Sequence, residues 1–155
     1  MSLNILLTRI DNRLIHGQVG VTWTTALNAN LLVVVDDLVA EDPIQQQLMT
    51  VTAKSSGAET RFFTIQKMID VIHKASDRQK IFIICRTPET VRKLIEGGVP
   101  IEKVNVGNMH FSPEKKQISA KVFVNEKDMK DLQFIKSKNV EVTIQDVPSD
   151  NKKNI

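Results

Sequence analysis

The chain has 155 residues, of which 41% are hydrophobic and 25% charged, which suits one soluble globular domain with a buried core. Its net charge of +3 comes from dispersed lysines and arginines, and aromatic residues make up only 5%, with no tyrosine. A nucleic-acid-binding protein usually has a basic face or an aromatic stacking platform, so we expect no nucleic-acid partner.

The cellular compartment is predicted from three features. The single cysteine, Cys85, lies in an apolar run, so we expect a buried packing residue and no internal disulfide. No run approaches the roughly 18 apolar residues of a membrane-spanning helix. The N-terminus also lacks the basic-then-apolar pattern of a signal peptide. The cytoplasm is therefore the expected location.

Apolar runs and amphipathic stretches alternate along the chain. Continuous apolar runs predict strands buried on both faces, and apolar residues at helical spacing predict the helices between them. The expected strands cover residues 5–8, 31–35, 59–63, 80–85, 103–106 and 140–144, with one or two short strands within 116–124. The expected helices cover residues 18–27, 65–75, 88–96 and 126–138, with a further helix starting at 43.

The helix that starts at Pro43 has Asp42 as its predicted N-cap. Its expected inward face consists of Ile44, Leu48, Val51 and Thr52. The alternation as a whole predicts one three-layer α/β/α domain over residues 1–148, with a mostly parallel central sheet and helices on both faces. A polar tail over residues 149–155 is expected to fray.

The most informative stretch, residues 9–18, directly follows the first predicted strand. It holds Arg9, Asp11, Arg13 and His16, with Gly17 behind the histidine. Arginines clamp phosphate oxygens, and histidine is easily made a nucleophile or proton carrier near neutral pH. In open parallel sheets, ligands bind beyond the carboxyl ends of the strands, which is where this loop lies. A helix starting near Gly17 would add free amides that favour an anion.

The residues alone leave three interpretations of this loop open. His16 could accept a phosphoryl group, or act as general acid and base on a bound phosphate ester. The cluster could also be a set of surface ion pairs contributing under about 1 kcal/mol each. The glycine-rich signatures of common nucleotide-binding loops are absent from the sequence.

The motif Arg9-Ile10-Asp11-Asn12-Arg13-Leu14-Ile15-His16-Gly17-Gln18-Val19 resembles the signature of the IIB subunit of the mannose/fructose/sorbose family of the sugar phosphotransferase system (PTS). The similarity continues through nearly the whole chain, at residues 34–42, 86–89, 97–100, 104–109 and 145–148. The first motif is specific, and the others would be weak alone. The chain has Gly107-Asn108 where many members of the family have two glycines.

The resemblance implies a phosphoryl carrier without a cofactor. His16 would take a phosphoryl group, through Nδ1, from a phosphohistidine of a IIA protein. It would pass the group to a sugar of the mannose, fructose, sorbose or amino-sugar class that crosses the membrane through IIC and IID subunits. Arg13 would help to hold the phosphoryl group and Asp11 to position the histidine loop. The resemblance also places the chain at the cytoplasmic side of the permease, and it allows a homodimer.

The remaining candidates for phosphate binding come from the spacing and from a second loop. They are Arg9, Gly17, Gln18, Asn108 and His110. Arg9 could instead end the strand, and His110 could be a plain loop histidine.

Asp36 and Asp37 end the second predicted strand, where carboxylates could bind a metal. The sequence groups no further oxygen ligands with them, so we expect a solvated pair at the strand end that caps the next turn, and no metal site. A histidine-dependent phosphoesterase and a non-catalytic phosphate-binding regulatory module remain the alternative functions.

Overall fold

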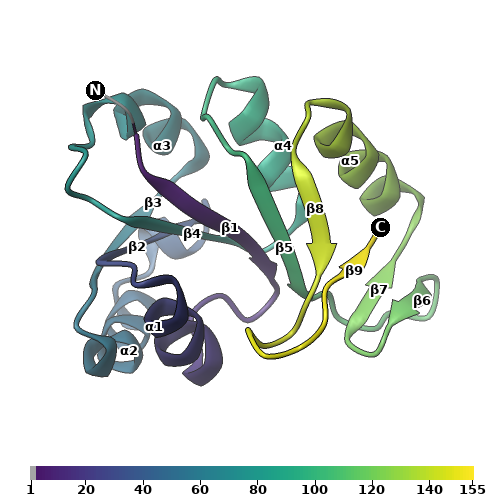
Figure 1. Cartoon of the computed structure of the whole chain (residues 1–155), viewed down its shortest axis with the longest axis horizontal. Coiled ribbons are helices and arrows are strands. Elements are labelled where there is room, and N and C mark those ends of the chain that lie inside the picture. The colour runs from purple at the N-terminus through teal and green to yellow at the C-terminus, as the bar shows by residue number, and fades with distance from the viewer. Residues whose placement is uncertain (1–2) are drawn as a thin grey trace.

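A computed structural model describes residues 3–155 of the chain, apart from the side chain of Gln18. A mostly parallel sheet forms the centre of the molecule (Figure 1). The strand order is β3-β2-β4-β1-β5-β8-β9, and every pairing is parallel except that of β9 with β8. The strands are β1 (Ile5–Asp11), β2 (Leu31–Val35), β3 (Glu59–Phe63), β4 (Ile81–Cys85), β5 (Lys103–Asn108), β8 (Glu141–Ile144) and β9 (Lys153–Asn154).

Helices cover both faces of this sheet, as Figure 1 shows. One face carries the π-helix η1 (Gln18–Trp23), α1 (Thr24–Leu27), η2 (Val39–Glu41), α2 (Pro43–Ala53) and η3 (Lys54–Ser56). The other carries α3 (Ile65–Val71), η4 (Ile72–Lys74), α4 (Pro88–Glu96) and α5 (Glu126–Ser137). A separate hairpin consists of β6 (Lys116–Ser119) and β7 (Val122–Val124). The predicted three-layer α/β/α architecture is confirmed. Within residues 3–155 no helix is long and apolar enough to cross a bilayer.

Two hydrophobic cores lie on opposite sides of the sheet. Along β2, Val33 and Val35 belong to the core under α3, α4 and α5, whereas Leu32 and Val34 belong to the core under η1 and α2. Successive side chains of a strand point to opposite faces, so a strand covered on both faces is apolar at every position. Cys85 ends β4 as a fully buried residue, as predicted.

The long helices start at the residues that the sequence indicates. The side chain of Asp42 accepts a hydrogen bond from the Gln45 amide at the start of α2, and Thr87 accepts one at the start of α4. Asn125 begins α5 with a capping box. Such caps satisfy amides that have no partner inside the helix.

The predicted inward face of α2 is wrong for its three aliphatic residues, whereas Thr52 is half-buried and faces η1. Ile44, Leu48 and Val51 are 73%, 59% and 64% exposed, and the buried residues of the helix are Met49 and Ala53. Close packing of η1 on α2 sets this rotation: a Cβ added to Gly20 of η1 would lie 3.4 Å from the Ala53 backbone. A small residue on each helix permits this approach, which turns the larger aliphatic side chains outward.

The polar tail does not fray. Lys153 and Asn154 pair with β8, and Ile155 packs against the hydrophobic core. The tail thus adds a short antiparallel edge strand to the sheet.

The loop after β1 lies where the connections of the sheet diverge. The helix that follows β1 covers one face of the sheet, whereas the helices that follow β4 and β5, the neighbours of β1, cover the other. Crossovers that leave in opposite directions open a crevice at the carboxyl ends of the strands, where α/β proteins bind ligands.

Candidate functional site

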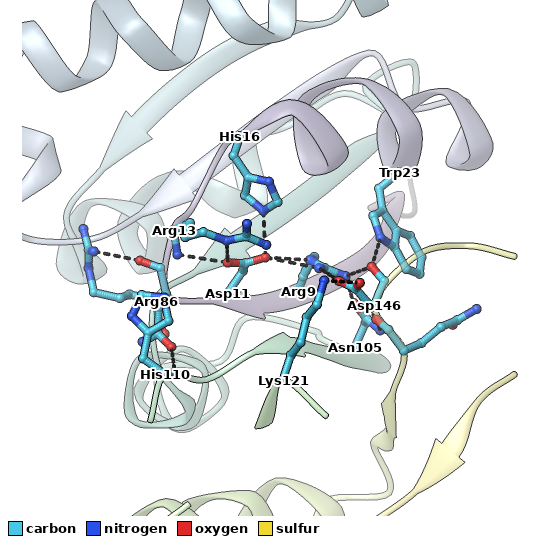
Figure 2. Close-up of polar contacts among 12 residues, drawn as sticks. Arg9, Asp11, Arg13, His16, Trp23, Arg86, Asn105, His110, Lys121 and Asp146 are labelled. Atoms are coloured by element: carbon cyan, nitrogen blue, oxygen red, sulfur yellow. Dashed lines mark hydrogen bonds and ion pairs between the residues drawn. The ribbon is translucent and has the colours of Figure 1, made fainter. Parts of the chain in front are cut away.

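Asp11 is the centre of the site, at the carboxyl end of β1 (Figure 2). Its side chain is fully buried. One carboxylate oxygen, Oδ2, lies 2.9 Å from His16 Nε2 and accepts two hydrogen bonds from Arg9, at 3.1 and 3.3 Å. The other, Oδ1, accepts the Arg13 amide at 2.9 Å.

These contacts keep the Asp11 carboxylate ionised. Burial alone would raise the pKa of its carboxyl group, but the hydrogen bonds from His16 and the Arg13 amide lower it. The positive charge of Arg9 lowers it further, and the net pKa of Asp11 lies below its usual range. Asp11 therefore acts as a hydrogen-bond acceptor at neutral pH.

His16 is oriented by this carboxylate. An ionised carboxylate can only accept, so Nε2 must carry the hydrogen of the His16–Asp11 contact. In the neutral imidazole, the lone pair is then on Nδ1. The imidazole side chain is 18% exposed, and Figure 2 shows it above Asp11 with Nε2 directed downward. The hydrogen bond to Asp11 therefore leaves Nδ1 as the ring nitrogen with a lone pair.

Arg13 supplies a cation next to the histidine. Its guanidinium Nε lies 3.6 Å from Asp11 Oδ1, and the side chain is 42% exposed. Figure 2 shows the Arg13 guanidinium and the His16 imidazole directed onto the same carboxylate. A half-exposed guanidinium keeps hydrogen-bond donors available for an incoming anion.

Arg9 lies behind Asp11. Strand β1 extends to Asp11 and not only to the predicted residue 8, so Arg9 is a strand residue with a fully buried side chain. Besides Asp11, its guanidinium donates to Asn105 Oδ1 at 2.7 Å and to the carbonyls of Gln145 and Asp146. Arg9 therefore supports Asp11, and its predicted contact with phosphate is wrong. The Arg9 side chain is buried, and protein groups accept the hydrogen bonds of its guanidinium.

Sequence reasoning missed the residues that surround Arg9. Asn105 of β5 also donates to the Gln145 carbonyl, and Trp23 donates from Nε1 to the Asp146 carbonyl at 2.8 Å. A Cβ at Gly107 would overlap the Arg9 guanidinium, so only glycine fits there. Asn105 is a polar residue inside the otherwise apolar part of the strand over residues 103–106, and this position in the sequence indicates a buried polar contact.

Besides the contacts to Asp11, hydrogen bonds of Asn12 fix the position of the histidine loop. The Asn12 amide donates to the Asn108 carbonyl, its side-chain Oδ1 accepts the His110 amide, and its own carbonyl accepts Arg86 Nη1 at 2.9 Å. Between Asn12 and His16, Leu14 is buried and has a φ of 57°, a left-handed backbone conformation that is unfavourable for leucine. Asn108 and His110 thus contact the loop through backbone groups.

Arg86, at the end of β4, joins this loop to Asp36. Its Nε donates to Asp36 Oδ1 at 3.2 Å, and Asp36 Oδ2 accepts the Val39 amide. Asp37 accepts the Ile65 amide. The predicted capping of the next turn is confirmed for Asp36, although this residue is buried and not solvated as expected, whereas Asp37 caps the start of α3. In the described part of the chain, no three His, Cys, Asp or Glu side chains are grouped as metal ligands would be.

Gly17 precedes η1 and is exposed, with no atom within 4 Å of an added Cβ. This open surface directly follows His16 in sequence. The side chain of Gln18 lies outside the described residues.

Comparisons with known proteins identify the family. The profile of the "PTS system sorbose subfamily IIB component" matches residues 5–155. The chain belongs to this family of PTS IIB components. The resemblance inferred from the His16 motif is confirmed.

Relatives support this assignment over the full length of this IIB chain. It is 66% identical to the N-acetylgalactosamine-specific phosphotransferase enzyme IIB component 1 of Escherichia coli K12, over 99% of this chain and 98% of the relative. A crystal structure of the E. coli N-acetylgalactosamine-specific IIB component 1 matches with a TM-score of 0.95, covering 98% of this chain and 99% of that one.

Two further relatives extend the comparison. The structure of a PTS-dependent N-acetyl-galactosamine IIB component from Streptococcus pyogenes is 40% identical, with a TM-score of 0.92 over 100% of this chain and 96% of that one. The mannose-specific EIIAB component of E. coli K12 is 36% identical over 94% of this chain, but only 45% of that longer protein is covered. This IIB chain is thus a phosphotransferase-system component whose fold is shared across sugar specificities.

Proposed function

We propose that this IIB component carries a phosphoryl group on Nδ1 of His16. The observation that carries the proposal is the contact of 2.9 Å between His16 Nε2 and the buried, ionised Asp11. It holds the hydrogen on Nε2 and leaves the Nδ1 lone pair for attack on phosphorus. The donor is a phosphohistidine on a IIA protein, in keeping with the EIIAB name of the mannose relative.

In the transfer step, His16 Nδ1 forms a bond to phosphorus while the N–P bond of the donor histidine breaks. The His16 ring gains positive charge as Nδ1 attacks, and Asp11 stabilises that charge through Nε2–H. Arg13 neutralises charge on the transferring group, and the amides that begin η1 beside Gly17 add hydrogen bonds. In the second transfer a sugar hydroxyl oxygen bonds to phosphorus, its proton passes to solvent, and the Nδ1–P bond breaks with its electron pair returning to Nδ1, which restores neutral His16.

The proposed sugar is N-acetylgalactosamine, accepted while it crosses through IIC and IID subunits at the membrane. This proposal is supported by the relatives at 66%, 49% and 40% identity, each named for that sugar. Vesicles that contain the matching IIC and IID subunits test it. With this IIB and phosphorylated IIA, they should phosphorylate N-acetylgalactosamine faster than mannose, fructose or sorbose, and an equal or reversed preference would contradict it.

Phosphoryl labelling tests the carrier function. Incubation with ³²P-labelled IIA should give the wild-type chain an acid-labile, base-stable label that is absent from His16→Ala. A phosphoesterase would release inorganic phosphate without retaining label, and a regulatory module would bind phosphate without a covalent label. A wild-type chain that takes no label from the matching IIA would refute the proposal.

A further inference from the structure

The outward face of α2 is unusually apolar for an exposed surface. Ile44, Leu48 and Val51 stand at helical spacing i, i+4 and i+7, so they form one stripe, and each is more than half exposed. Isolated exposed aliphatic residues are common on protein surfaces, but a row of them along one helix marks an interaction site.

Two elements that pack against α2 carry further exposed apolar side chains. Leu38, which precedes η2, is 79% exposed, and Val21 of η1 is 37% exposed. Both η1 and η2 pack against α2. We name the set of these side chains the α2 patch, consisting of Val21, Leu38, Ile44, Leu48 and Val51.

The α2 patch also lacks charge along the helix. Residues 43–53 include no Lys, Arg, Asp or Glu. The exposed faces of α4 and α5, on the other side of the sheet, carry ion pairs such as Lys93–Glu89 and Lys127–Glu89. Depletion of charged residues distinguishes the core of a protein–protein interface from ordinary surface.

The size of the stripe favours a partner that binds and leaves. From Ile44 to Val51 the helix rises about 10 Å, at 1.5 Å per residue. A stable interface buries about 800 Å² on each partner. The stripe alone is too small to hold two copies of this chain together permanently. Transient binding suits a carrier, which must release its donor before it meets its acceptor.

The position of the patch connects it to His16. Helix α2 begins after the carboxyl end of β2, at the edge of the sheet where β1 ends, and η1 begins two residues after His16 and packs on α2. Figure 1 shows α1 and α2 together on one face of the sheet. A footprint of about 800 Å² has a radius of about 16 Å. A protein centred on His16 with such a footprint extends over η1 toward the helix on which η1 packs, α2.

We propose that the α2 patch is the surface on which the phosphorylated IIA donor docks. The inference rests on the proposed carrier function and adds a site to it. Apolar side chains of IIA cover the patch while its phosphohistidine meets Nδ1 of His16, and polar groups around the histidine loop align the two rings.

Kinetics of phosphoryl transfer test this docking surface. Leu48→Asp places a charge in the stripe, and the double variant Ile44→Ala/Leu48→Ala removes apolar area without adding charge. Gln133→Asp is the matched control, because it adds the same charge at an exposed position of α5 on the opposite face of the sheet. Initial rates with ³²P-labelled IIA give KM and kcat for each variant. Labelling by potassium phosphoramidate, a small donor, measures the reactivity of His16 itself.

We expect Leu48→Asp to raise the KM for IIA about tenfold or more, as for an interface anchor, with kcat unchanged. The double alanine variant should raise KM by less, and Gln133→Asp should match the wild type. All variants should react with phosphoramidate at the wild-type rate.

Three other outcomes would overturn the docking proposal. The first is equal KM values for Leu48→Asp and wild type. The second is a wild-type dimer in sedimentation that Leu48→Asp dissociates while the KM for IIA stays the same, since a second copy would then occupy the patch. The third is unchanged transfer from IIA with slower sugar phosphorylation in IIC/IID vesicles, which would assign the patch to the permease. A wild-type chain that accepts no label from IIA would instead overturn the carrier function.

Discussion

Replacing Arg9 with methionine should destabilise this protein far more than breaking a surface ion pair. Arg9 and Asp11 both have fully buried side chains, and they share two hydrogen bonds. Methionine fills much of the volume of arginine but leaves the Asp11 carboxylate buried without its cation. It also leaves Asn105 Oδ1 without the Arg9 donor, while the Gln145 and Asp146 carbonyls keep only their bonds from Asn105 and Trp23.

The expected loss is about 3–5 kcal/mol in the free energy of unfolding, the usual cost of removing one partner of a buried ion pair. Arg61→Met is the matched control. Arg61 contacts Glu59 at 3.0 Å, but the two side chains are 47% and 70% exposed. An exposed pair contributes about 0–1 kcal/mol, so the two substitutions should differ several-fold in effect. Arg9→Lys keeps the positive charge but has fewer hydrogen-bond donors, so its loss in unfolding free energy should lie between those of Arg9→Met and Arg61→Met.

The loss should also depend on pH. In the wild type, Asp11 has a lowered pKa and stays ionised in mildly acidic solution. Without Arg9, one of the positive charges that lower the pKa of Asp11 is lost, so the folded variant takes up its proton at a higher pH than the folded wild type. Once the pH has fallen through both folded pKa values, Asp11 is protonated in either protein and this part of the stability difference is gone. The difference between wild type and Arg9→Met should therefore narrow at lower pH.

Urea unfolding at neutral pH and at about pH 3, below the unfolded pKa of Asp11, measures both effects. The double variant Arg9→Met/Asp11→Asn should cost less than the sum of its single substitutions, because each alone leaves a buried charge. A loss as small as that of Arg61→Met, or a loss that is the same at both pH values, would refute the assignment of Arg9 as the support of Asp11.

Three other predictions concern residues near this pair. Gly107→Ala should lower the unfolding free energy by about 1–3 kcal/mol because the added methyl group overlaps Arg9, whereas Gly17→Ala, which faces open space, should change it by under about 0.5 kcal/mol in the same urea assay. Arg13→Ala should leave stability within about 0.5 kcal/mol but slow phosphoryl transfer from IIA by about 10²-fold, and equal labelling rates would remove Arg13 from the site. The lowered pKa of Asp11 stabilises the fold above the unfolded value of about 3.9, and this contribution disappears as pH falls through the folded pKa. Asp11→Asn should abolish that part of the acid dependence, and an unchanged slope in acid unfolding would count against it.

The layers of the fold could be predicted because burial on both faces leaves a direct pattern. Apolar runs such as residues 31–35 identify the parallel strands, and caps such as Asp42 identify the starts of helices. The rotation of α2 could not be predicted in this way. Its apolar stripe has helical spacing but faces outward, since the contact between Gly20 and Ala53 depends on how two helices meet.

The candidate site could be predicted where its residues are close in sequence. His16, Arg13 and Asp11 stand within six positions, and the structure brings them together. The role of Arg9 could not be read from the motif, because its other partners come from residues 105, 145 and 146, which only the folded sheet brings near. A charged residue next to a strand was therefore assigned to the loop, although its partners make it a core residue.

The surroundings of Trp23 give this protein a built-in optical probe. Trp23 is the only tryptophan and the chain has no tyrosine, so its ultraviolet fluorescence comes essentially from this indole. The ring is almost fully buried, donates to the Asp146 carbonyl and lies 5.2 Å below the Arg9 guanidinium. Any event that shifts Asp11, Arg9 or the last loop changes the electric field and hydrogen bonding of the indole. Its emission wavelength and quenching therefore report on movements of this pair without an attached dye.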